Sequence, residues 1–136
     1  MRKILYSSIL FLLFLCSCQQ KSWEQRCEED AQKYTLTHCP QDMGNGIFFD
    51  SLIYVQQTNT NEYYYSVHNV DNDAQLFDSL KNDITLDLIE QIANSIELKP
   101  YKEHGMNLRY IYNSTTSGQV LYDHTFTKKE NGNYSE

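Results

Sequence analysis

Cysteine and histidine are the residue types of this sequence best suited to covalent, redox or metal chemistry. The chain has four of each: Cys16, Cys18, Cys27, Cys39, His38, His68, His104 and His124. Cys27 and Cys39 have neither the spacing of a C-x-x-C redox pair nor that of a zinc motif. The histidines are scattered, and only His68 and His124 could approach each other if their strands pair. We therefore expect no metal, no cofactor and no catalytic residue here.

The first 18 residues have the parts of an export signal. Arg2 and Lys3 give a basic start, and residues 9–15 form an apolar run. This run has the length of a secretory signal and is too short for a transmembrane helix, which needs about 20 apolar residues. One interpretation is an ordinary signal peptide cut near this point, with Cys18 free or paired.

A more specific pattern ends this segment. The residues Leu15-Cys16-Ser17-Cys18 resemble the lipobox of bacterial lipoproteins, in which the cysteine becomes the first residue and carries a diacylglycerol. Cys16 is the poorer candidate, because its use would put the bulky Leu15 at the cleavage position. The resemblance implies a signal peptide over residues 1–17, lipidation of Cys18, and a lipidated tether over residues 18–22.

The residues after Cys18 bear on location. Two or three acyl chains hold a protein stably at a membrane, whereas one chain binds reversibly. Gln19 stands where an aspartate is the usual signal for retention at the inner membrane, so the resemblance implies an outer-membrane lipoprotein that faces the periplasm. From Gln19 to Ser22 the tether reaches only on the order of 15 Å. The domain that follows must lie close to the membrane.

Cys27 and Cys39 remain as a candidate disulfide, because an exported chain enters a compartment that permits disulfides. If a helix carrying Cys27 runs to Thr37, its rise of about 1.5 Å per residue keeps the two cysteines apart. A bridge requires the helix to stop near Tyr34 and the chain to fold back. The alternative is two separate thiols, and the sequence leaves both arrangements open.

The charge balance excludes one class of partner. The chain has 11 basic and 18 acidic residues and a formal net charge of −7, and loss of Arg2 and Lys3 with the signal would leave 9 basic residues and a charge of −9. Affinity for nucleic acid comes mainly from contacts between Lys or Arg and phosphates. We therefore expect a protein that does not bind nucleic acid.

Hydrophobic periodicity predicts two helices and two hairpins. A capping box at Ser22–Gln25 begins the first helix, and Cys39-Pro40 ends it. Strands are expected over residues 47–57 and 62–70, and again over 107–113 and 119–127. Pro100 ends the second helix, whose apolar residues recur with a period near 3.6. These residues are Phe77, Leu80, Ile84, Leu88, Ile92 and Ile96.

The order helix, hairpin, helix, hairpin suggests two αββ units. These would form a four-stranded antiparallel sheet with two helices packed on one face, an α+β fold. We expect a single domain over residues 23–128 and a polar C-terminal tail over residues 129–136. This element order, with Cys39-Pro40, Asp50-Ser51-Leu52 and Tyr63-Tyr64-Tyr65, resembles small uncharacterised envelope lipoproteins of Bacteroidota type, which implies no particular activity.

Tyrosine is the enriched residue type, with eleven in the chain. Tyr63 and Tyr65 share one strand face, and Tyr110 and Tyr112 share another. Tyrosine combines a rigid apolar ring with one hydroxyl and is enriched at interfaces, so these four residues form a candidate binding face. The alternative is that they fill half-buried strands, because tyrosine favours β-structure.

Catalytic motifs such as G-x-S-x-G, H-E-x-x-H and the P-loop do not occur in the sequence. The leading hypothesis is a non-enzymatic, lipid-anchored envelope protein that faces the periplasm and binds another envelope protein through its sheet. One alternative is a proteinaceous inhibitor of an envelope or secreted hydrolase. A third hypothesis is a hydrolase with an unrecognised site.

Overall fold

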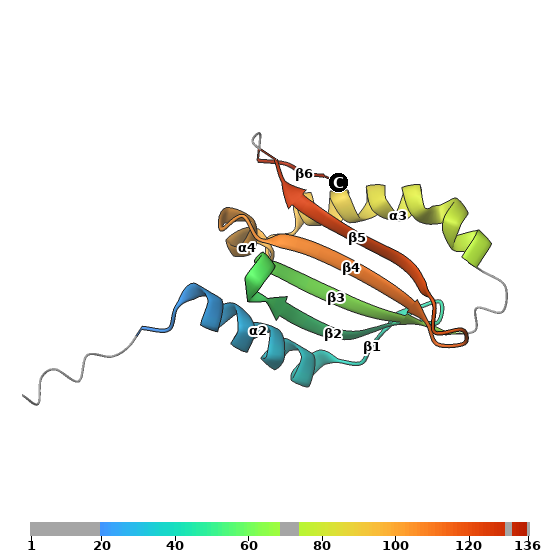
Figure 1. Ribbon diagram of the computed structural model, residues 1–136, viewed down its shortest axis with the longest axis horizontal. Coiled ribbons are helices and arrows are strands. Elements are labelled where there is room, and N and C mark those ends of the chain that lie inside the picture. The colour runs from blue at the N-terminus through green and yellow to red at the C-terminus, as the bar shows by residue number, and fades with distance from the viewer. Residues whose placement is uncertain (1–19, 69–73, 130–131, 136) are drawn as a thin grey trace, which may run out of the picture.

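A computed structural model describes residues 20–68, 74–129 and 132–135, so the predicted signal peptide and Cys18 lie outside the described residues. Figure 1 shows the helices and strands of these residues. Their bounds are α2 Trp23–His38, β1 Gln41–Gly44, β2 Ile47–Val55, η2 Gln56–Thr58, β3 Thr60–Val67, α3 Ala74–Asn94, α4 Lys99–Glu103, β4 Asn107–Ser114, β5 Val120–Lys128 and β6 Tyr134–Ser135.

The strands form one sheet in the order β1-β2-β3-β4-β5-β6. β2 and β3 form an antiparallel hairpin, and so do β4 and β5. β3 and β4, however, are parallel, with Thr60 opposite Asn107 and Val67 opposite Ser114. The predicted four-stranded antiparallel sheet is therefore wrong. Over the described ranges the fold is α+β, with six strands in one mixed sheet and three helices.

The length of α3 explains the parallel pair. At about 1.5 Å per residue, the 21 residues of this helix span roughly 32 Å. The eight residues of β3 span roughly 27 Å. The helix therefore carries the chain back along the whole sheet, and β4 starts at the same end as β3. A helical return of this kind joins parallel neighbours, whereas a tight turn joins antiparallel ones.

Three further features differ from the expected elements. β1 lies in a segment expected as loop, and it pairs with the start of β2 through a turn in which Asn45 and Gly46 have left-handed backbones. Pro100 lies in the first turn of α4, while α3 already ends at Asn94. Tyr134, in the segment expected as a polar tail, is buried, and its hydroxyl donates to the Met106 carbonyl at 2.7 Å.

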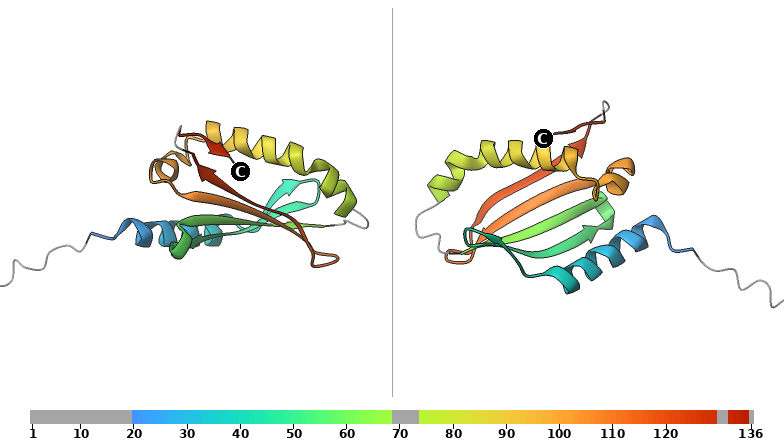
Figure 2. Two further views of the ribbon diagram at one scale, coloured as in Figure 1. Left: turned by 45° about the horizontal axis from the view of Figure 1, so that its top comes forward. Right: turned by 180° about the vertical axis from the view of Figure 1, so that it is seen from behind.

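α2 and α3 lie on the same face of the sheet, near opposite edges (Figure 2, right). The predicted capping box begins α2: the Ser22 hydroxyl accepts from the Gln25 N–H at 3.2 Å, and the Gln25 side chain accepts from the Ser22 N–H at 3.1 Å. α2 packs beside β2, whereas α3 packs against β5 and β6. The two central strands lie between the helices.

The main core lies beneath α3. Leu88 and Ile92 of this helix belong to one buried cluster with Leu108 of β4 and Phe126 of β5. The hydroxyl groups of Thr85 and Tyr122, 2.9 Å apart, connect the helix to β5. Full burial of an aliphatic or aromatic side chain is worth roughly 1.5–3 kcal/mol. The packing of α3 is therefore the strongest hydrophobic contribution that a helix makes to this domain.

A charged cluster spans β3, β4 and β5 on the opposite face. Arg109 donates to Asp123 from Nε at 2.7 Å and from Nη2 at 2.6 Å, and to Glu62 from Nη1 at 2.8 Å. These hydrogen bonds raise the pKa of Arg109, and the bond from Arg109 holds the pKa of Asp123 below its usual range. Bidentate pairs of this type have defined geometry. Arg109 therefore joins the two hairpins across their parallel boundary.

Candidate functional site

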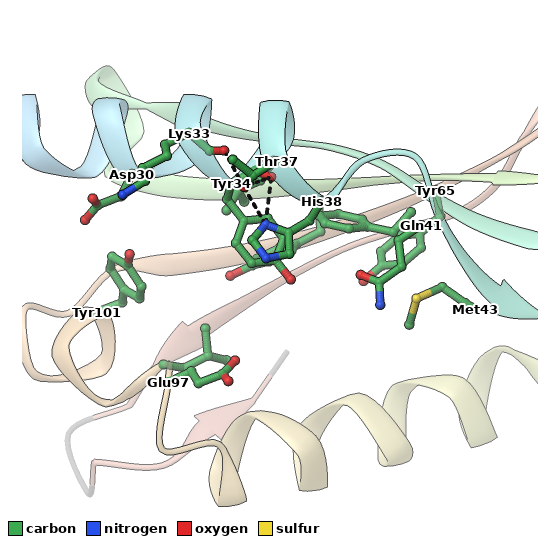
Figure 3. A pocket seen from close by; sticks show the side chains of 14 residues that line it. Asp30, Lys33, Tyr34, Thr37, His38, Gln41, Met43, Tyr65, Glu97 and Tyr101 are labelled. Carbon is green, nitrogen blue, oxygen red and sulfur yellow. Dashed lines mark hydrogen bonds between the residues drawn. The ribbon is translucent and has the colours of Figure 1, made fainter.

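A groove of about 560 Å³ lies on the helix-bearing face, between α2 and the segment that leads from α3 into α4 (Figure 3). β2 and β3 supply the floor, and β1 contributes at the end away from α4. Most of the side chains in its floor and far wall are apolar or aromatic. They include Met43, Phe49, Leu52, Tyr63, Leu98 and Tyr101.

The wall formed by α2 depends on small buried side chains. Cys27 and Ala31 are the buried residues of this helix, and their size lets it lie close to the sheet. The Thr35 hydroxyl donates to the Leu52 carbonyl at 3.0 Å and accepts from the Leu52 N–H at 2.8 Å. Both backbone groups point away from β3, so Thr35 fixes α2 along the outer edge of β2.

The opposite wall is the short helix α4 with the connection before it. The Lys102 ammonium donates to the carbonyls of Ile92 and Ala93 at 2.7 and 3.0 Å, at the end of α3. The Trp23 ring stacks on His104 with ring centroids 3.6 Å apart and lies 6.0 Å from Tyr101. α4 is therefore held to the end of α3 and to the start of α2.

The four tyrosines of the candidate binding face lie side by side on the groove side of the sheet. The parallel register puts Tyr63 opposite Tyr110 and Tyr65 opposite Tyr112. The stacked rings are 4.8 and 4.5 Å apart between centroids. Tyr63 and Tyr65 line the groove, whereas Tyr110 is buried and Tyr112 packs toward Phe77. Two tyrosines thus form floor surface, and two support it from the side.

Burial is the largest cause that raises the pKa of all four tyrosine hydroxyls, and it raises that of Tyr112 to about 12. The hydroxyls are therefore neutral at physiological pH. A neutral aromatic floor with a few hydroxyl groups suits an apolar partner surface that carries few polar atoms. It does not supply an anionic nucleophile.

The polar end of α2 contains the arrangement closest to a catalytic pair. The Nδ1 atom of His38 lies 2.7 Å from the Thr37 hydroxyl, and the His38 ring stacks on Tyr34 with centroids 4.3 Å apart. A nucleophilic pair needs the hydroxyl proton to be directed at the imidazole. Here the Thr37 hydroxyl donates to the Lys33 carbonyl at 2.8 Å. These contacts order the C-terminal end of α2.

Cys27 and Cys39 are both free thiols. α2 runs from Trp23 to His38, and Cys39 is its C-cap, so the helix holds the two residues about 18 Å apart along its axis. A disulfide needs Cα atoms roughly 4.4–6.8 Å apart. Burial raises the pKa of Cys27 to about 11 and also raises that of Cys39. The structure therefore has the arrangement with two separate, protonated thiols.

The structure does not bring His68 and His124 together. His124 lies opposite Tyr110 in the middle of the sheet, whereas His68 follows Val67, which lies opposite Ser114 at the far end of β4. No group of three histidine, cysteine or acidic side chains among the described residues could hold a metal ion. The helices in that part of the chain include none with the length and hydrophobicity needed to cross a membrane.

Sequence reasoning identified Tyr63, Tyr65 and the helix that forms the α2 wall, but it missed the opposite wall and the β1 end of the groove. Met43 lies in a strand that was expected as loop, and Tyr101 lies in a helix that was not expected. Pro100 is the signal that could have revealed α4, because proline is common in the first turn of a helix as well as after its end. The positions of Leu98 and Tyr101 beside α2 depend on tertiary packing.

Comparison with known structures finds similar structures among proteins from Pseudomonas and Vibrio. A candidate secreted protein from Pseudomonas aeruginosa superposes with a TM-score of 0.65 at 13% identity, over 83% of this chain and 98% of that chain. The type 2 secretion system pilotin EpsS of Vibrio vulnificus superposes with a TM-score of 0.53 at 11% identity, over 75% of this chain and 84% of that chain. The type II secretion system pilotin AspS of Vibrio cholerae superposes with a TM-score of 0.47 at 17% identity, over 75% of this chain and 85% of that chain.

At these identities the likeness concerns the fold alone. No curated protein sequence matches the chain. A family model described as a domain of unknown function (DUF8479) matches residues 22–122, which extend from the N-cap of α2 into β5 and include the whole groove. The chain belongs to this family.

Proposed function

We propose that this protein is a lipid-anchored, non-enzymatic binding protein of the cell envelope, and that its groove holds an apolar helix of another envelope protein. The observation that carries the proposal is the part of the sheet that lies between α2 and α3 (Figure 2, right), where aromatic side chains form the groove floor. Tyr63 and Tyr65 belong to this floor and line the groove.

The spacing of the two helices favours a helix as the bound element. α2 follows the outer edge of β2, and α3 packs against β5 and β6. Because neighbouring strands lie about 4.8 Å apart, these two positions are roughly 20 Å from each other. Packed helices lie about 8–10 Å apart. One additional helix therefore fits between α2 and α3, where it would cover the groove floor that β2 and β3 supply.

The charges beside the groove restrict the sequence of such a helix. Asp30 projects from α2, and Glu97 lies on the opposite wall (Figure 3). Lys33 is the lysine that lines the same groove. A helix with an apolar stripe toward the floor and a Lys or Arg on each flank would pair with both carboxylates. Complementary charges of this kind set orientation and selectivity more than affinity.

The envelope location rests on the N-terminal sequence and on the shared fold. The Leu15-Cys16-Ser17-Cys18 pattern supports lipidation of Cys18, and Gln19 supports an outer-membrane position facing the periplasm. The fold shared with a secretion-system pilotin, at a TM-score of 0.53, supports an envelope role that is not catalytic. The neutral tyrosines and the orientation of Thr37 in the groove also favour binding over catalysis.

Crosslinking in intact cells tests the groove. A photoreactive residue at Leu52, which lines the groove, should capture one envelope protein, while the same residue at Ile53 should not. Ile53 is the matched control because it is the next residue of β2, points to the opposite face and is 47% exposed. Met43→Asp, at a side chain 53% exposed, should abolish the Leu52 crosslink without changing the circular dichroism spectrum. Equal capture from Leu52 and Ile53 contradicts the proposal.

Labelling with a fatty acid tests the anchor. Cys18→Ser should remove the label, because serine has no thiol to form the thioether, and the export signal is unchanged. Cys16→Ser should keep the label, because Cys16 leaves with the signal peptide. Incorporation of fatty acid into Cys18→Ser, or a mature chain that begins at another residue, contradicts lipidation at Cys18.

A further inference from the structure

We infer that the end of the domain next to the tether is a docking surface for an anionic phospholipid membrane. The surface is built around a basic patch, which consists of Lys99, Lys102 and Lys128. This inference rests on the lipid anchor of the proposed function, and it concerns a part of the molecule outside the groove.

Contacts locate the patch beside the point where the tether enters the domain. Trp23, the first residue of α2, packs against Tyr101 and His104, which belong to α4 and its cap. α4 carries two of the three lysines, and the Lys128 ammonium donates to the Lys102 carbonyl at 2.9 Å. Because Trp23 is five residues after Cys18, an anchored chain holds this end within about 18 Å of its lipid.

The patch is positive although the chain as a whole is acidic. In the described part of the chain, the Lys102 and Lys128 ammonium groups donate to carbonyl oxygens and form no ion pair. The Oε1 atom of Glu103 lies 4.0 Å from the Nζ atom of Lys99. A recess of about 270 Å³ lies between α4 and the chain around β6, bordered by three lysines and one carboxylate, those of Lys99, Lys102, Lys128 and Glu103. Such a recess can accept a phosphate group, while the carbonyl bonds hold two of the ammonium groups in place.

Aromatic residues occupy the same end. Trp23 and Tyr101 are half-buried neighbours, and Arg26 lies over the Trp23 ring at 5.5 Å from its centroid. Tryptophan and tyrosine are enriched where proteins meet the headgroup region of a membrane. Aromatic and cationic side chains therefore lie at the end of the domain that the tether holds nearest to the lipid, together with Glu24 in the first turn of α2.

Electrostatic attraction acts over the distance that the tether permits. The attraction of a Lys or Arg to an anionic membrane strengthens binding by about fivefold for each residue near the surface. The effect decays over a Debye length of about 10 Å at 0.1 M salt. Asp78 and Asp83 lie in the first half of α3, toward the other end of the sheet, where repulsion from the same membrane is weakest.

This orientation determines which end of the groove lies nearer to the membrane. The groove follows α2 from Tyr101, near the tether, to Met43 at the end away from α4. With the basic patch on the membrane, Tyr101 lies at the membrane side and Met43 lies farthest into the periplasm. A partner helix would then enter from the periplasmic end or from the open side of the groove.

Lysine labelling tests the docking surface in the full, lipidated protein. The protein is reconstituted in vesicles of phosphatidylcholine, with or without phosphatidylglycerol, and treated with a water-soluble amine reagent. Lys99 and Lys128 should react several-fold more slowly in the anionic vesicles, whereas Lys33 and Lys81 should react equally in both. Equal labelling of Lys99 and Lys128 in the two vesicles overturns the inference.

Trp23 provides a second measurement, because it is the only tryptophan of the chain. Brominated phosphatidylglycerol should quench its fluorescence in the anionic vesicles. Replacing two lysines in Lys99→Gln/Lys128→Gln should shift the docked–undocked equilibrium by about 25-fold and reduce the quenching. Lys33→Gln/Lys81→Gln is the matched control with the same change in net charge, and it should leave the quenching of Trp23 unchanged. Equal quenching in both double variants contradicts the role of the patch.

Flotation of the vesicles separates this inference from the proposed function. A protein that does not float with vesicles lacks the anchor, which refutes the lipidation proposal and the docking surface together. A protein that floats but shows no difference between the two vesicle types refutes the docking surface alone. The Leu52 crosslink reports on the groove and depends on neither result.

Discussion

α2 and α3 pack on the same face of one sheet, but they bury different kinds of side chain. α3 contributes large residues, including Leu88 and Ile92, to the main hydrophobic cluster. α2 buries only Cys27 and Ala31, and a hydroxyl, that of Thr35, ties it to the edge of β2. Large side chains fill the space between helix and sheet, while small ones leave part of the aromatic floor accessible.

The difference shows how one sheet face can hold both a closed core and an open groove. Under α3 the interior is closed, since Leu108 and Phe126 are fully buried. Beside α2 the strands carry similar side chains, but Tyr63 and Tyr65 border a groove. Strand composition alone does not distinguish the two regions. The two regions are distinguished by the size of the side chains that each helix packs against the strands.

The largest expected effect tests the closed side. Leu88→Asp should unfold the domain, because Leu88 is buried and an unpaired charge in the core costs several kcal/mol. Leu86→Asp is the matched control on the same helix, since Leu86 is 65% exposed, and it should change the free energy of unfolding by less than about 0.5 kcal/mol. Urea denaturation followed by circular dichroism measures both. A folded Leu88→Asp protein would show that α3 does not close the core.

The next effect tests the tyrosines that the two regions share. Burial raises the pKa of Tyr112 to about 12 in the folded state, against about 10 when unfolded. The neutral hydroxyl therefore stabilises the fold fully below pH 10, and this contribution, on the order of 2 kcal/mol, is lost as the pH rises from 10 toward 12. Urea midpoints measured from pH 8 to 11.5 should be level at first and then fall.

Tyr112→Phe is the control for this pH dependence. The variant removes one ionising hydroxyl and keeps the ring that stacks on Tyr65. Its urea midpoint should fall less steeply above pH 10 than that of the wild-type protein. If both proteins lose stability equally over this range, ionisation of Tyr112 does not contribute, and its hydroxyl is less buried than the structure indicates.

The smallest expected effect tests the attachment of α2 beside the groove. Thr35→Val keeps the shape of the side chain but removes both hydrogen bonds to Leu52, which should cost about 1–2 kcal/mol. Because α2 buries little apolar surface, the loss should appear as faster hydrogen exchange in α2, with little change in β4 and β5. Thr37→Val, at an exposed hydroxyl bonded within its own helix, is the control. Equal acceleration across the sheet would mean that α2 and the core unfold together.

The sequence predicted the elements better than their arrangement. Local signals located the capping box at Ser22, the end of α2 before Cys39-Pro40, and both hairpins. The parallel pairing of β3 with β4 was missed, because a hairpin pattern specifies the partner within the hairpin and not the neighbour beyond it. The length of α3 was the available signal, since a helix as long as the sheet must return the chain to the end where β3 began.

The candidate site was predictable only in part. Alternation along the strands identified Tyr63, Tyr65, Tyr110 and Tyr112 as pairs on strand faces, but only tertiary structure decides which pair borders a groove. Leu98 and Tyr101 reach the groove through α4, whose position depends on contacts with Trp23 and with the end of α3. Such contacts between distant segments leave no periodic signal in the sequence.

The single parallel pair also determines how the chain must assemble. In each of the other strand pairs a short connection joins the two strands. Thr60 of β3, however, pairs with Asn107 of β4, and the whole of α3 lies between them in the sequence. Loop-closure entropy opposes such a contact before any pairing energy rewards it. Pairing of β3 with β4 is thus the step that needs the longest search, and until it forms, the two hairpins present unpaired strand edges.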